Sequence, residues 1–219
     1  MRKNFIAFLL IGIIALSLAA CGNQGKGPKQ SATDQEQEAV PATAEYKNVF
    51  QTSVFLGDSI TEGLSFHDVL DEANVLAGAG KTAEFALEDI EELAKRNPKH
   101  IFILLGSDDI LWPTDDPKQY SLTQYAKLID TIKDKLPGAA ITILPVTPVT
   151  AEAEQEEPRY RNIEDYNQGL KELAAKEQVG FVDLSSIFAG NPDVHDADGI
   201  HFKAEFYPLM LDLLKDQVK

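Results

Sequence analysis

Five short apolar segments recur along the chain from about residue 50, and longer polar segments separate them. The apolar segments span residues 53–57, 74–77, 100–105, 140–146 and 180–184. Each is short enough for one β-strand, and each is apolar almost throughout rather than alternating. This pattern is typical of strands that are buried on both faces of a parallel sheet.

The segments between these strands carry apolar residues at helical spacing. Leu122, Tyr125, Ile129 and Ile132 fall on one face of a helix that Pro137-Gly138 ends. Ser121 and Gln124 have the spacing of a capping box, which places the start of that helix near residue 121. Further helices are expected at about residues 82–96, 163–173 and 204–217.

Alternating strands and helices predict an α/β fold, with helices covering both faces of a five-stranded parallel sheet. In such folds the ligand lies beyond the carboxyl ends of the strands. The polar residues that come after the predicted strands are therefore the candidates for chemistry. They are Asp58-Ser59, Gly80, the run from Gly106 to Asp109, and the segment from Asp198 to His201.

The first 20 residues have the pattern of a secretory signal peptide. Arg2 and Lys3 precede an apolar stretch, and small residues stand before Cys21. Residues 18–21 resemble the lipobox of bacterial lipoproteins, which implies a lipid on Cys21 and an extracytoplasmic, membrane-anchored protein. An ordinary signal peptide and an uncleaved anchor are the alternatives. Because Cys21 is the only cysteine, an intramolecular disulfide and a thiol nucleophile are both excluded.

Residues 21–47 are rich in Gly, Gln, Ala, Pro and Glu and have no apolar period, so we expect a flexible linker there. Residues 48–219 are enough for a single domain with a full core, and we expect a monomer. The formal net charge of −15 argues against binding to nucleic acid and against electrostatic docking on anionic lipids.

Four short motifs in the domain resemble the blocks of the SGNH (GDSL-type) hydrolases. Gly57-Asp58-Ser59-Ile60 is similar to the first block, Gly80 to the glycine of the second, Gly106-Ser107-Asp108-Asp109 to the third, and Asp198-x-x-His201 to the last. Each motif alone is weak evidence, but all four occur in the family's order and each follows a predicted strand. The resemblance implies a three-layer α/β/α sandwich with flavodoxin-like topology and a serine esterase that needs no cofactor.

The chemistry of a Ser-His-Asp triad also follows from the residue types. A serine hydroxyl becomes nucleophilic when a positioned base removes its proton, and an imidazole with a pKa near 6.5 is such a base. We assign these roles to Ser59 and His201, and Asp198 would orient the imidazole. His195 is an alternative base. A metal site formed by His195, Asp196, Asp198 and His201 is the other alternative, and we assign no metal.

The resemblance implies three oxyanion donors: the backbone N–H groups of Ser59 and Gly80, and the side chain at position 108. The family usually has asparagine there, whereas this chain has Asp108, and an ionised carboxylate only accepts hydrogen bonds. Three hypotheses remain open: Asp108 is protonated and donates, it points away, or the domain binds esters or glycans with little turnover. Asp58 and Asp109 are expected to be structural.

Family analogy and the expected location outside the membrane favour O-acetylated glycans or cell-wall polymers as substrates. Other short acyl esters come next and lysophospholipids third. The polar, acidic stretch at residues 150–161 argues against an apolar lid for long acyl chains. The alternative from another class is a non-catalytic lipoprotein that binds acyl groups or glycans.

Overall fold

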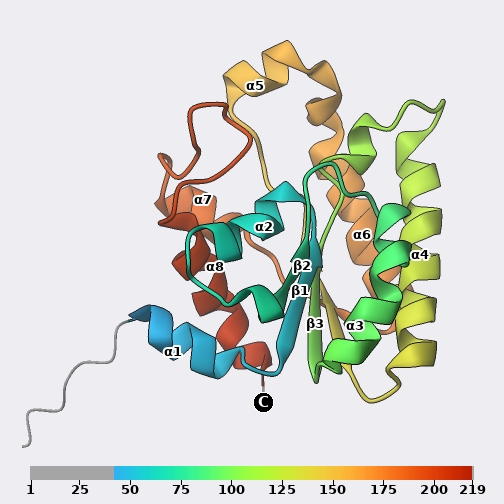
Figure 1. Ribbon diagram of the computed structural model, residues 1–219. Helices are drawn as coiled ribbons and strands as arrows, with labels where there is room; N and C mark the ends of the chain where they lie inside the picture. Colours follow the sequence, from blue (N-terminus) through green and yellow to red (C-terminus); the bar gives the residue numbers. More distant parts are fainter. Residues whose placement is uncertain (1–41, 219) are drawn as a thin grey trace, which may run out of the picture. The chain divides into compact units, whose positions relative to one another are not determined.

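The computed structural model describes residues 42–218, which form a five-stranded sheet with helices on both sides (Figure 1). The predicted signal peptide, Cys21 and most of the predicted linker lie outside the described residues. The strand order is β2-β1-β3-β4-β5, and all four strand pairings are parallel. The strands are β1 (Ser53–Gly57), β2 (Val75–Ala77), β3 (His100–Leu104), β4 (Ala140–Ile143) and β5 (Gly180–Phe181). The predicted parallel α/β sheet is confirmed.

Helices cover both faces of the sheet (Figure 1). One face packs against α3 (Ile90–Arg96), α4 (Pro117–Lys135) and α6 (Ile163–Glu177). The other packs against α1 (Ala42–Val49), α2 (Ser59–Phe66), α7 (Ser185–Gly190) and α8 (Phe206–Leu214). Helix α5 (Ala151–Glu156) lies beyond the carboxyl ends of the strands. Short 3-10 helices span Glu72–Asn74, Phe85–Asp89, Asp109–Leu111, Pro158–Asn162 and Lys215–Gln217.

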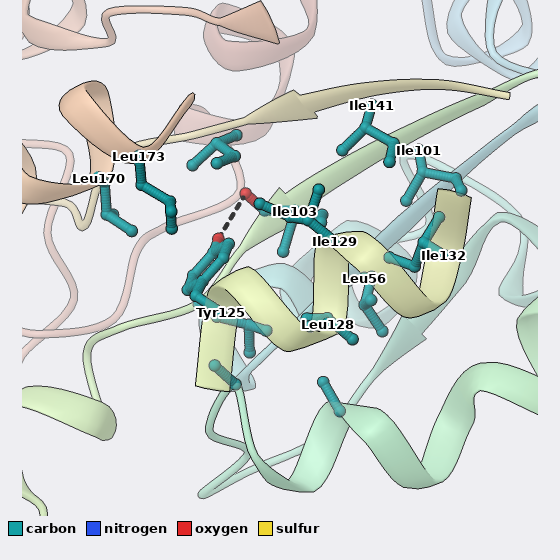
Figure 2. Close-up of a cluster of buried hydrophobic side chains, with 14 of the residues drawn as sticks. Leu56, Ile101, Ile103, Tyr125, Leu128, Ile129, Ile132, Ile141, Leu170 and Leu173 are labelled. Carbon is teal, nitrogen blue, oxygen red and sulfur yellow. Dashed lines mark hydrogen bonds between the residues drawn. The ribbon is translucent and has the colours of Figure 1, made fainter. Parts of the chain in front are cut away.

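Each face of the sheet has its own apolar core. Figure 2 shows the core beneath α4, where the Tyr125 hydroxyl donates a hydrogen bond of 3.4 Å to the carbonyl of Ile103 in β3. On the opposite face, the rings of Phe55 and Phe102 stack with their centroids 4.8 Å apart. The sheet is therefore packed on both faces, and the loops that follow the strands begin at its carboxyl edge.

Strands β4 and β5 are shorter than the sequence predicts. We expected residues 140–146 and 180–184, but β4 ends at Ile143 and β5 at Phe181. Pro145 has no N–H to donate to a neighbouring strand, so the regular ladder stops near it. The amide of Leu144 still donates to the carbonyl of Ile103, at 2.8 Å. The chain beyond it runs on without regular pairing.

The predicted capping box of the long helix is wrong. Helix α4 begins at Pro117, where Asp116 is the N-cap and accepts a hydrogen bond of 2.9 Å from the amide of Gln119. Ser121 lies inside the helix, and its hydroxyl donates to Asp109 at 2.6 Å. An aspartate followed by proline at the first helical position is itself a strong start signal, and here it overrides the later serine.

Three further segments differ from expectation. Residues 42–47, assigned to the flexible linker, belong to α1, where Tyr46 is buried. The expected helix over residues 82–96 divides into the 3-10 helix Phe85–Asp89 and α3. The expected loop after β4 contains α5, which Thr150 caps by accepting a hydrogen bond from the amide of Ala153. None of the helices within residues 42–218 has the length and apolarity that a membrane span requires.

Candidate active site

Ser59 stands at the first position of α2, directly after β1. The turn that presents it is tight: a Cβ on Gly57 would lie 1.9 Å from the hydroxyl oxygen of Thr61 and 2.4 Å from the carbonyl oxygen of Leu104. Asp58 is the N-cap of α2 and accepts a hydrogen bond of 3.0 Å from the amide of Ile60. Asp58 rather than Ser59 therefore caps the helix, and the Ser59 hydroxyl stays available for other contacts.

Ser59, His201 and Asp198 form a continuous hydrogen-bonded chain. The His201 Nε2 atom lies 2.9 Å from the Ser59 Oγ atom, across 142 positions of sequence. On the other side of the ring, Nδ1 lies 2.5 Å from the Asp198 Oδ2 atom. The second oxygen of Asp198 accepts from the amides of Ile200 and His201, both at 2.9 Å.

The electrostatics of Asp198 suit a carboxylate that stays ionised. Burial alone would raise its pKa, but hydrogen bonds from the His201 ring and from the amides of Ile200 and His201 outweigh burial and lower it to about 2. Because Asp198 holds the Nδ1 proton of His201, the Nε2 atom is left as the acceptor that faces Ser59. The three side chains therefore have the geometry of a nucleophile, a base and an orienting acid.

His195, the alternative base, makes a different contact. Its Nε2 atom lies 2.8 Å from the carbonyl oxygen of Pro148, and residue 195 pairs with Phe202 in an antiparallel bridge. The amide of Thr150 donates to the carbonyl of Gly199 at 2.9 Å. These contacts fasten the loop that carries His201 to the segment after β4. Across residues 42–218, no three His, Cys, Asp or Glu side chains converge as a metal site requires.

Gly80 lies in an exposed turn beside the end of β1. The amide of Gly78 donates to the carbonyl of Gly57 at 3.2 Å, and Lys81 forms an ion pair with Asp89 on the other side of the turn. Gly80 has a φ of +74°, which favours glycine, and a Cβ there would meet no described atom within 4 Å. The turn thus presents bare backbone to open space near the end of β1.

Asp108 follows β3 and is half-buried. Burial raises the pKa of its carboxyl group above the ordinary value, and attraction to His201 lowers it in part. Its charge in turn raises the pKa of Asp58. No hydrogen bond within the described residues contributes to the pKa of Asp108. Its carboxyl group is therefore electrostatically coupled to the candidate base and lacks a fixed partner.

Asp58 and Asp109 are structural, as the sequence predicts. Asp58 is fully buried and also accepts a hydrogen bond from the Ser107 hydroxyl. Asp109 accepts from the Ser121 hydroxyl at 2.6 Å and from the amide of Ala83 at 3.1 Å. Burial raises the pKa of Asp58 to about 7 and that of Asp109 to about 6, because little water reaches either carboxylate. Both tie the ends of β1 and β3 to their neighbours.

A cavity of about 280 Å³ opens beside Ser59 and His201. Its wall also includes residues that were not assigned a role from the sequence, among them Glu62, Phe66, His67 and Tyr207. The first two stand three and seven positions after Ser59, so they share its face of α2. Helical spacing counted from Ser59 could therefore have predicted that these two residues line the site. Trp112, by contrast, packs on the rings of Phe85 and Tyr120.

The GDSL-like lipase/acylhydrolase family model matches residues 55–209, which include Ser59, Gly80, Asp108, Asp198 and His201. The chain belongs to this family. It is accordingly a serine hydrolase that acts on esters.

Solved structures have the same fold at low sequence identity. A GDSL-like lipase from Bacteroides thetaiotaomicron is 18% identical with a TM-score of 0.61, covering 80% of this chain and 98% of that one. The acetyl xylan esterase AlAXEase is 17% identical with a TM-score of 0.59, covering 76% and 99%. A peptidoglycan O-acetylesterase is 18% identical with a TM-score of 0.55, covering 65% and 45%. A search of curated proteins finds no match.

Proposed function

We propose that this protein is an extracytoplasmic serine esterase that removes short acyl groups, above all acetyl groups, from glycans or cell-wall polymers. The observation that carries the proposal is the hydrogen-bonded chain from Ser59 through His201 to Asp198, with distances of 2.9 and 2.5 Å. Such an arrangement serves nucleophilic attack on a carbonyl carbon.

The reaction follows from this geometry in two steps. The Ser59 oxygen attacks the carbonyl carbon of the ester while His201 takes the hydroxyl proton. The bond to the alcohol oxygen then breaks, His201 returns the proton to the departing alcohol, and the acyl group stays on Ser59. Water, deprotonated by His201, attacks the acyl-enzyme and releases the carboxylic acid. Asp198 stabilises the imidazolium in both steps and stays ionised.

The oxyanion donors we propose are the backbone N–H groups of Ser59 and Gly80 and the side chain of Asp108. Asp108 donates only in its protonated form, as a carboxylic acid. The burial that raises its pKa supports the protonated form, whereas attraction to His201 acts in the opposite direction. Hydrolysis then slows as the pH rises and Asp108 loses its proton.

The substrate class is supported by what the similar structures are called. One is an acetyl xylan esterase and another a peptidoglycan O-acetylesterase, so acetylated polymers are hydrolysed by proteins with this fold. Lysophospholipids are a less favoured substrate.

The proposed location depends on the N-terminal sequence. Arg2, Lys3 and the apolar stretch up to Cys21 support a cleaved signal peptide and a lipid anchor on that cysteine. Labelled palmitate is expected to be incorporated into the wild type and not into the Cys21→Ser variant. Equal labelling of the two would contradict the anchor.

A fluorophosphonate probe tests the catalytic proposal directly. The probe forms a covalent bond with an activated serine, so we expect labelling of the wild type and none of Ser59→Ala. The Ser65→Ala variant is the matched control, because Ser65 is also in α2 and donates only to the carbonyl of Glu62. Equal failure of the wild type and Ser59→Ala to react would favour the alternative, a protein that binds acyl groups or glycans without turnover.

A further inference from the structure

The cavity beside Ser59 lies on the His201 side of the nucleophile. Its wall includes Ser59, Asp198 and His201, but neither Gly80 nor Asp108, the proposed oxyanion donors. The departing alcohol oxygen must take its proton from His201 and therefore lies next to that ring. The cavity is thus placed to receive the alcohol portion of the ester, and the side chains of its wall determine which alcohols fit.

The wall of this cavity carries unbalanced negative charge. Glu62 and Asp196 contribute carboxylates in addition to Asp198, whereas no lysine or arginine belongs to the wall. Within residues 42–218, no ion pair involves Glu62 or Asp196, and the Asp196 side chain accepts only from the amide of Ala197, at 2.7 Å. His67 is the second histidine in the wall, beside His201. Two carboxylates without a cation therefore face the leaving-group side.

The same wall carries aromatic rings. Phe66 is 81% exposed, the largest exposed fraction among the large apolar side chains of the described residues. Its ring centroid lies 5.0 Å from that of His67, which lies 5.2 Å from that of Tyr207. Gly63 makes this packing possible, because a Cβ there would lie 1.7 Å from the Tyr207 hydroxyl. The face of an aromatic ring attracts cations, and nearby carboxylates add to that attraction.

We propose that the preferred substrate is an ester whose alcohol portion carries a positive charge, an amino or quaternary ammonium group. Glu62 and Asp196 attract the charge, and Phe66 covers it in the mouth of the cavity. This inference rests on the proposed ester hydrolysis at Ser59 and narrows its substrate class. For a glycan substrate it means a sugar with a free amino group close to the ester.

Two esters of the same shape isolate the effect of the charge. Acetylcholine and 3,3-dimethylbutyl acetate have the same acyl group and the same branched head, which is cationic in the first and neutral in the second. We expect kcat/KM to be about tenfold higher for acetylcholine at low ionic strength, since each exposed ion pair contributes a few-fold and the ring adds to it. The preference should shrink in 0.5 M salt, where exposed charges are screened.

Variants assign the preference to residues. In the double variant Glu62→Gln/Asp196→Asn, the ratio between the two esters is expected to fall several-fold, and the smaller preference that remains comes from the Phe66 ring. In the control Glu88→Gln/Asp193→Asn, which removes two exposed carboxylates outside the wall, the ratio should stay within twofold of the wild type. The readout is a ratio measured on one enzyme, so a general loss of activity in a variant cancels.

The outcomes separate this inference from the proposed function. Hydrolysis of both esters at equal rates, or a preference for the neutral one, overturns the inference and leaves the esterase intact. If the ratio is unchanged in Glu62→Gln/Asp196→Asn, these two carboxylates do not cause the preference for the cationic ester. No hydrolysis of either ester or of p-nitrophenyl acetate above the Ser59→Ala rate overturns the proposed function itself. If only p-nitrophenyl acetate reacts, inhibition by choline and by 3,3-dimethylbutanol decides: stronger inhibition by choline supports the inference, and equal inhibition overturns it.

Discussion

Replacing Asp108 with asparagine exchanges an ionisable carboxyl group for an amide of nearly the same shape. An amide donates hydrogen bonds at every pH, whereas the carboxyl group donates only while it is protonated. If Asp108 faces the oxyanion, the Asp108→Asn variant gains a permanent donor and loses a negative charge that repels the transition state. We therefore expect the variant to hydrolyse esters faster than the wild type at alkaline pH.

The size of the effect depends on how much the site excludes water. One oxyanion donor is worth on the order of 10²–10³ in rate, or about 2.7–4 kcal/mol. Asp108 is half-buried, so solvent screens part of its interaction and the lower end applies. We expect kcat/KM of the variant to exceed that of the wild type about 10²-fold at pH 8.5. As the pH falls and Asp108 takes up a proton, the two enzymes should converge.

The assay is hydrolysis of p-nitrophenyl acetate between pH 5 and 9, with the rate of Ser59→Ala subtracted. The useful quantity is the ratio of kcat/KM between variant and wild type at each pH. The change of this ratio with pH reports the loss of the Asp108 carboxyl group, whose pKa is raised by burial. Because Asp108 also interacts with His201, the ratio includes the effect of removing its charge beside the base.

Asp115→Asn is the matched control, because Asp115 is an exposed carboxylate between β3 and α4 with no ion pair among the described residues. Its rate should stay within twofold of the wild type. A ratio for Asp108→Asn that does not change with pH would refute the role of a protonated donor. A variant no faster than the wild type at pH 8.5 would show that Asp108 does not face the oxyanion.

Three further predictions concern the triad, the cavity wall and the buried acid. Asp198→Asn should lower kcat for p-nitrophenyl acetate about 10³–10⁴-fold, because the amide favours the wrong imidazole tautomer; a loss below tenfold would contradict its role. Gly63→Ala forces a Cβ to 1.7 Å from the Tyr207 hydroxyl, so urea unfolding should show a loss of about 1–3 kcal/mol, while Gly138→Ala, whose Cβ meets no described atom within 4 Å, should change stability little. Burial raises the pKa of Asp58 to about 7, so the folded state binds more protons than the unfolded chain between about pH 4 and 7, and the free energy of unfolding falls as the pH rises through that range. The decrease attributable to this group is at most about 4 kcal/mol and should be absent in Asp58→Asn; equal pH dependence in both proteins would contradict it.

The sheet and the main candidate residues could be predicted because they depend on local patterns. Apolar runs such as residues 100–105 form strands wherever helices cover them, and the residues that follow parallel strands meet at one edge. Ser59 and His201 lie 142 positions apart, and the family motif Asp198-x-x-His201 together with this rule predicts that they meet. The predicted strand over residues 140–146 was too long, because Pro145 has no N–H to continue the hydrogen bonding between the strands.

The cavity wall could not be predicted in this way. Glu62 and Phe66 share a face with Ser59, but which partner element lies opposite that face depends on α8, more than 140 positions away. The two helices pack closely there, with Tyr207 of α8 against Gly63 of α2. The predicted boundary between the linker and the domain, at residue 48, was placed too late for a related reason. The composition of residues 42–47 resembles a linker, and a single buried side chain, Tyr46, joins that segment to the core.

The loop that carries Asp198 and His201 is held by contacts with the segment after β4, through Pro148 and Thr150. Its base therefore reaches Ser59 only after almost the whole chain has emerged and folded. During synthesis, a chain that has already formed β1 and α2 has an inert serine.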